Sequence, residues 1–113
     1  MTLHHHPDVD ALICGNDQIA RGALDMLREA GRRVPHDVAV IGFDDWHPLT
    51  TGARPQLTSV DMRLKELGRR AAQALSEAIE SPGGAGAGSR NSAAVSRLTL
   101  PARLAVRAST APL

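Results

Sequence analysis

Two short polar segments of this chain carry the side chains best suited to chemistry. Asn16 and Asp17 follow one apolar run, and Asp44 and Asp45 follow a second apolar run further along the chain. An amide offers hydrogen-bond donors and an acceptor together, and an ionised carboxylate accepts several hydrogen bonds. Such groups, brought close together, would suit the recognition of a small polar molecule.

The two apolar runs predict the elements that position these groups. We expect one strand at residues 10–14 and another at Val38–Phe43, each apolar enough to be a parallel strand covered on both faces. Between them, apolar residues recur at helical spacing until Gly31, which is typical of a helix that ends at a glycine. Because the carboxyl ends of neighbouring parallel strands lie side by side and commonly bind ligands, we expect Asn16 and Asp44 to face one crevice.

The rest of the chain predicts a second helix with little to cover it. The expected elements, in chain order, are a loop at 44–56, an extended piece at Leu57–Val60, a helix at 63–80 capped by Asp61, a low-complexity loop at 81–96 and two short strands separated by Pro101. The apolar stripe of the helix consists of Leu64, Leu67, Gly68, Ala71, Leu75, Ala78 and Ile79. Two helices and so small a sheet rarely cover each other, so we expect the chain to be part of a larger α/β body.

Composition limits the classes of function. The chain has 113 residues, a net charge of +1 and 42% hydrophobic residues, which is typical of one small globular domain. No basic stretch is dense enough to favour nucleic-acid binding by the chain itself, and no apolar run approaches the length of a membrane span. The N-terminus lacks the features of a secretory signal, and the single cysteine, Cys14, lies in an apolar run, as expected of a buried thiol in a reducing compartment. We therefore expect a cytoplasmic protein, and no metal site, because no further ligand stands at suitable spacing from His4–His6.

Five motifs resemble those of one family and occur in the same order. They are Asn16–Leu24, Gly31–Asp45, Pro55–Val60, Glu66–Ala71 and Leu100–Thr110. Over nearly its whole length the chain resembles the lactose/galactose repressor (LacI/GalR) family of bacterial transcription regulators. The resemblance implies an α/β fold of the periplasmic-binding-protein-like type I, present in part, with a parallel sheet flanked by helices. Residues 1–7 would be a flexible lead, and 8–113 would be the C-terminal portion of an effector-sensing domain, with the low-complexity loop at 81–96.

The resemblance also implies how the chain divides. Residues 8–60 look like the second half of the C-terminal subdomain, and the segment near Val60–Met62 looks like a crossover at the hinge. The helix at 63–80 and a strand at 97–100 would belong to the N-terminal subdomain, before the last strand returns. Family members bind DNA through a helix-turn-helix that this chain does not contain, so we expect DNA contact only through that module.

Two positions match effector-binding residues of the family. Asn16 matches an amide that hydrogen-bonds the effector, often at sugar hydroxyls, and its alternative role is that of a helix cap. Asp44 matches the effector-binding carboxylate, and its alternative role is that of a solvated turn acid. Asp17 and Asp45 are interpreted as structural residues of a helix start and a turn.

Two further ligand-binding candidates have alternatives that the sequence leaves open. Trp46 could stack on the face of a sugar ring, or it could cover a dimer contact. Met62 stands where many family members carry a polar glutamine, which indicates a less polar effector face near the hinge.

The leading hypothesis is the effector-sensing part of a transcription regulator, without catalytic residues or a cofactor, that binds a small sugar-like molecule. By resemblance, the complete regulator is a homodimer that pairs partly through the helix after Asn16, where Ile19 and Met26 lack an obvious partner within the chain. One alternative is a stand-alone solute-binding protein of the same fold. The other is a magnesium-dependent phosphotransfer enzyme built on Asp44 and Asp45, which is disfavoured because the only lysine is expected on an exposed helix face.

Overall fold

The computed structural model describes residues 2–81 and 97–111 and divides into two compact units. The first unit contains the residues up to Met62 together with those from Ala102 onwards, and the second contains 63–101. The division falls beside the crossover expected near Val60–Met62. The low-complexity loop expected at 81–96 lies, apart from its first residue, outside the described residues.

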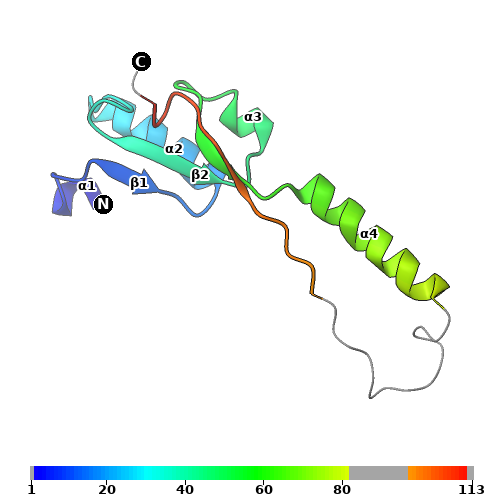
Figure 1. Ribbon diagram of the computed structural model, residues 1–113. Coiled ribbons are helices and arrows are strands. Elements are labelled where there is room, and N and C mark those ends of the chain that lie inside the picture. Colours follow the sequence, from blue (N-terminus) through cyan, green and yellow to red (C-terminus); the bar gives the residue numbers. More distant parts are fainter. Residues whose placement is uncertain (1, 82–96, 112–113) are drawn as a thin grey trace. The chain divides into compact units, whose positions relative to one another are not determined.

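The first unit is built on a four-stranded sheet (Figure 1). Its elements, in chain order, are α1 Thr2–His5, β1 Ala11–Ile13, α2 Asp17–Glu29, β2 Ala39–Phe43, α3 His47–Thr50, β3 Thr58–Asp61 and β4 Arg103–Ala105. The strands lie in the order β1-β2-β3-β4, with the first three parallel and β4 antiparallel to β3. The sheet is therefore mixed, because the last strand returns to the unit in the opposite direction.

The core of the first unit lies between α2 and one face of the sheet. The helix begins after its cap residue Asn16 and ends before Gly31, whose φ of 69° suits a residue without a side chain. On the buried face of α2, apolar residues recur at helical spacing: Ala20, Leu24 and Leu27. They belong to one cluster with buried residues of the sheet and its loops: Cys14, Val38, Val40, Ala53 and Leu57. Fully burying one leucine side chain contributes roughly 1.5–3 kcal/mol.

The other face of the sheet is exposed, so the expectation of strands covered on both faces is wrong for the described residues. β1 is shorter than the strand expected at 10–14, and its Ile13 side chain is 82% exposed. In β2, Val40 is buried whereas Phe43 is exposed. A strand points successive side chains to opposite faces, and α2 covers only one of them. The apolar sequences of the strands therefore predicted a second layer over the other face of the sheet, and the described residues contain no such layer.

Two short helices form where irregular chain was expected. α3 lies within the loop expected at 44–56, and Pro48 stands in its first turn, where a helix needs no donor from the residue. α1 lies within the lead expected to be flexible at 1–7. Proline and glycine content predicted an irregular loop at 44–56 and missed the single helical turn of α3.

The second unit contains α4, Leu64–Glu80, and an extended segment at 97–100 that forms no strand. The expectation that Asp61 caps this helix is wrong. Asp61 lies in β3, where its carboxylate pairs with the guanidinium of Arg103 in β4 at 3.1 Å. The residue at the cap position is Arg63, whose φ of 54° is left-handed and whose side chain makes no capping bond.

α4 contains no buried residue, and its apolar stripe is exposed. Leu75 is 63% exposed and Ile79 is 70% exposed. The expectation that this stripe lacks a cover is therefore confirmed for the described residues. None of the described helices is long and apolar enough to cross a membrane.

Candidate functional site

A hollow of about 210 Å³ opens beside the start of α2 and the end of β2. Six residues line it: Asn16, Asp17, Gln18, Asp44, Trp46 and Leu49. The expectation that Asn16 and Asp44 face one crevice is thus confirmed, because both side chains follow neighbouring parallel strands. Met62 is not among the lining residues and lies half-buried at the end of the first unit.

Asn16 is the cap of α2. Its Oδ1 accepts a hydrogen bond from the backbone N of Ile19 at 2.8 Å, and its backbone is extended, as a cap residue requires. The helix-cap interpretation is therefore confirmed, and it leaves the amide nitrogen with two donors that bond to nothing in the described part of the chain. Capping and ligand binding use different atoms of this side chain, so the two roles are compatible.

Asp44 stands in an unusual turn after β2. Its φ is 107° and that of Asp45 is 52°, so two consecutive residues lie in the region that side chains rarely adopt. The backbone N of Asp44 donates to the carbonyl of Val60 in β3 at 3.0 Å, which ties the turn to the sheet. The Asp44 side chain is exposed at the hollow.

Asp17 is only 1% exposed and is fully engaged by hydrogen bonds. Its Oδ2 accepts from the backbone N of Trp46 at 2.8 Å, and its Oδ1 accepts from the hydroxyl of Ser59 at 2.6 Å. Gly42 of β2 leaves room for this carboxylate, because a Cβ atom added there would collide with Asp17 Oδ1. The interpretation of Asp17 as a structural residue is supported by these contacts.

Asp45 is also held by the protein. Its carboxylate, 8% exposed, pairs with the guanidinium of Arg107 at 2.8 Å, and its backbone N donates to Ser59 Oγ at 3.0 Å. Arg107 donates in addition to the carbonyl of Leu57 at 2.9 Å. Sequence reasoning missed the roles of Ser59 and Arg107, because hydrogen bonds between segments so distant in sequence leave no local pattern.

Trp46 precedes α3 and presents an exposed indole, 56% accessible, at the rim of the hollow. Its backbone is fixed by Asp17, as described above, whereas its ring remains available. His47, the first residue of α3, places Nε2 3.6 Å from Asp45 Oδ2. The residue that could stack on a ligand therefore stands on a backbone held from within the unit.

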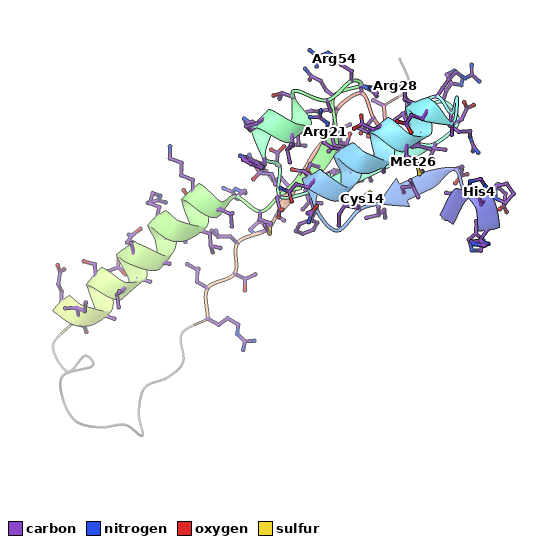
Figure 2. All side chains as sticks on the ribbon, turned by 180° about the vertical axis from the view of Figure 1, so that it is seen from behind. His4, Cys14, Arg21, Met26, Arg28 and Arg54 are labelled. Atoms are coloured by element: carbon purple, nitrogen blue, oxygen red, sulfur yellow. The ribbon has the colours of Figure 1, made fainter. Side chains whose placement is uncertain are left out.

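Two arginines fasten α2 to the segment around α3. Arg21 Nη1 donates to the carbonyl of Leu49 at 3.3 Å, and Arg28 Nη2 donates to the carbonyl of Arg54 at 2.7 Å. Arg54 donates in turn to the carbonyl of Thr51 at 2.9 Å. Figure 2 shows Arg21 and Arg28 on α2 and Arg54 in the segment after α3. These bonds hold the α3 side of the hollow in place.

The described residues contain no group of three or more side chains that could hold a metal ion. Cys14, directly after β1, is buried, and this burial raises the pKa of its thiol. A raised pKa lowers the fraction of thiolate, which is the reactive form, so Cys14 is suited to packing rather than to nucleophilic chemistry.

The sequence profile of the periplasmic binding protein-like domain matches residues 1–110. The chain belongs to this family. One curated relative is the HTH-type transcriptional regulator CelR of Thermobifida fusca, to which this chain is 43% identical over 77 residues. The match covers 68% of this chain but only 22% of the relative, so the chain spans about a fifth of the regulator's length.

Solved structures of LacI-family regulators have the same fold. A complex of the transcriptional regulator CelR with cellobiose has a TM-score of 0.73 and 38% identity, covering 95% of this chain and 30% of that one. A LacI family transcriptional regulator from Arthrobacter sp. FB24, in complex with lactose, has a TM-score of 0.74 and 40% identity, covering 96% of this chain and 37% of that one. The family resemblance and the fold class expected from the sequence are therefore confirmed.

Proposed function

We propose that this chain is the effector-sensing part of a LacI-family transcription regulator and that it binds a small, sugar-like molecule in the hollow at Asn16 and Asp44. The observation that carries the proposal is the meeting of these two side chains at one hollow, after neighbouring parallel strands. Similarity to regulators solved with cellobiose and with lactose supports a hydroxyl-rich ligand.

Four of the lining residues have distinct parts in the proposed binding. The Asp44 carboxylate accepts hydrogen bonds from two hydroxyl groups, and the free amide nitrogen of Asn16 donates to a third oxygen. Trp46 covers the apolar face of a sugar ring, and Leu49 lines the same hollow. Met62 does not line the hollow, and its less polar contact with the effector stays a prediction from the sequence.

The proposal assigns no catalysis to the chain. The two acids after β2 do not form a free pair, because the Asp45 carboxylate is occupied by Arg107 whereas Asp44 is exposed. A magnesium-dependent phosphotransfer site needs both acids available to the metal. A solute-binding protein of the same fold remains the alternative that shares this hollow.

The complete regulator is proposed to act as a cytoplasmic homodimer that contacts DNA through a helix-turn-helix elsewhere in its sequence. α2 is the proposed pairing helix, because Ile19 is 57% exposed and Met26 is half-buried on it. Figure 2 shows Met26 on this helix. Sedimentation of the complete protein tests this. A dimer at micromolar concentration is expected, and a monomer would contradict the pairing.

Trp46 makes the binding proposal measurable, because it is the only tryptophan and the chain has no tyrosine. Cellobiose and lactose are titrated to millimolar concentration while the fluorescence of Trp46 is recorded. We expect a weak but saturable change with at least one of them, because the chain alone is expected to supply only half of the cleft. Asp44→Asn should lose affinity about tenfold or more, because hydrogen bonds to a charged group contribute about 1.5–3 kcal/mol. Asparagine tolerates the same backbone conformation, so this variant keeps the turn.

Two variants serve as controls for the titration. Asn16→Asp keeps the oxygen that caps α2 but removes the amide donors, so weaker binding with unchanged helix content assigns the nitrogen to the ligand. Asp25→Asn makes the same chemical change as Asp44→Asn at an exposed position of α2 and should leave binding unchanged. No response of Trp46 to either sugar, or equal binding by Asp44→Asn, would refute the proposed site.

A further inference from the structure

The turn that carries Asp44 and Trp46 is held from beneath by a buried chain of hydrogen bonds. Asp17 accepts from the backbone N of Trp46 and from the hydroxyl of Ser59, and the same hydroxyl accepts from the backbone N of Asp45. Arg107, which lies 62 residues further along the sequence, pairs with the Asp45 carboxylate. The start of α2, strand β3 and the segment after β4 thus each hold Asp45 or Trp46 of the turn.

The conformation of this turn requires such support. Asp44 and Asp45 both have positive φ, and residues in that region persist only where the surrounding structure determines them. Hydrogen-bond acceptors fixed in the interior can supply this support, because a buried hydrogen bond is not readily exchanged for one to water. Asp17 and Ser59 are both fully buried, with exposed fractions of 1% and 0%.

Asp17 cannot serve the ligand and the turn with the same atoms. Both of its oxygens already accept a hydrogen bond, one from Trp46 and one from Ser59. β2 is shaped around it, because Gly42 is the residue whose Cβ would collide with Asp17 Oδ1. A buried carboxylate that is bonded on both sides is suited to fixing its neighbours in position.

We propose that Asp17 and Arg107 are positioning residues that hold the turn at 44–46 in its binding shape before any ligand arrives. The identity of what the turn binds rests on the proposed function, whereas the holding of the turn does not. Arg107 belongs to the part of the first unit that follows the second unit in the sequence. Because Arg107 bonds both Asp45 and Thr58 of β3, the turn has its full set of contacts only when the segment after β4 has packed against β3.

Hydrogen exchange of backbone amides tests the proposal in the ligand-free chain, at concentrations too low for association. The reporters are the amides of Asp45 and Trp46, and the reference is the amide of Leu27 in the core helix. In Asp17→Asn we expect the Trp46 amide to exchange about tenfold faster or more, with Leu27 unchanged, because local opening is measured separately from global unfolding. Asp25→Asn, the same change at an exposed site of α2, should alter neither reporter.

Two further substitutions test the remaining contacts. Ser59→Ala removes one hydroxyl and should speed exchange at Asp45, and it decides the question if Asp17→Asn does not fold. Arg107→Gln should also loosen Asp45, and Arg107→Lys should restore part of the protection because it keeps the positive charge. Unchanged exchange at both reporters in folded variants would overturn the proposal, as would equal acceleration at Leu27, which would indicate a merely structural role.

The titration with cellobiose and lactose separates this proposal from the proposed function. If the parent chain binds one of them, Asp17→Asn should weaken binding about tenfold, although its Asp44 and Asn16 are intact. Undiminished affinity in a variant whose turn exchanges faster would overturn the positioning role. If the parent binds neither sugar, the proposed ligand class fails, and the exchange result alone decides whether the turn is held by Asp17 and Arg107.

Discussion

The two units of this chain treat their apolar side chains in opposite ways. α2 in the first unit buries Leu24 and Leu27 almost completely, whereas α4 in the second unit leaves Leu75 and Ile79 mostly exposed. Both helices carry apolar residues at helical spacing, so the difference does not arise from the helices themselves. α2 lies on a sheet, and α4 has no such layer within the described residues. An amphipathic pattern predicts that a face is to be covered but does not identify the element that covers it.

The largest expected effect comes from removing the same side chain in each helix. Leu27→Ala should lower the free energy of unfolding by about 2–5 kcal/mol, because it leaves a cavity in the core. Leu75→Ala should change it by less than about 0.5 kcal/mol, because the side chain is exposed. Urea denaturation measures both. Similar losses in the two variants would show that α4 is covered in solution and would remove the contrast between the units.

A serine in each unit gives the next largest contrast. Ser109 is fully buried; its hydroxyl donates to the carbonyl of Val40 at 2.6 Å and accepts from the backbone N of Thr58 at 2.8 Å. Ser109→Ala leaves both backbone groups without this partner and should cost about 1–3 kcal/mol. Ser81→Ala, at the exposed end of α4, should cost little. Equal stability of the two variants by thermal unfolding would contradict the importance of this bridge.

The exposed apolar stripe of α4 should bind an environment-sensitive dye. We expect the chain alone to be marginally stable or associated through this helix, because proteins rarely leave so large an apolar surface in water. The double variant Leu75→Gln, Ile79→Gln should lower the dye signal and change stability by no more than about 0.5 kcal/mol. A sharp cooperative transition of a dye-silent monomer would refute the expectation.

The smallest effect is a pH dependence of one exposed ion pair. Hydrogen bonds from Arg33 lower the pKa of Asp37 to about 2, below its unfolded value of about 4. The pair's contribution to stability is therefore present above pH about 4 and is lost as the pH falls through about 2. Arg69 lowers the pKa of Glu66 on α4 in the same way. NMR titration should find both carboxyl groups titrating low, and an ordinary pKa for Asp37 would contradict the pairing.

The sequence predicted those features that depend on local pattern or on general topology. α2 was predicted because its apolar spacing, its cap at Asn16 and Gly31 all agree. The meeting of Asn16 and Asp44 was predicted because neighbouring parallel strands bring their carboxyl ends together. These inferences need no knowledge of distant contacts.

The features that were missed depend on tertiary contacts. Asp61 has the chemistry of a helix cap, but pairing of β3 with β4 places Arg103 beside it. The pairing of Asp45 with Arg107 joins residues 62 positions apart, and α3 forms around a proline that suggested irregular chain. Burial of Asp17 likewise depends on Gly42 of another element. Each miss is a case in which packing between segments determined the role of a residue whose local pattern was ambiguous.

The pairing of β3 with β4 makes the second unit an insertion in topological terms. Asp61 and Arg103 are partners in the antiparallel register, and the chain between them contains all of the second unit. A short type I′ turn such as Asn-Gly closes two strands in this arrangement. Joining Asp61 to Arg103 by such a turn would convert the excursion into a simple β-hairpin and yield a miniature scaffold that retains Asn16, Asp44 and Arg107.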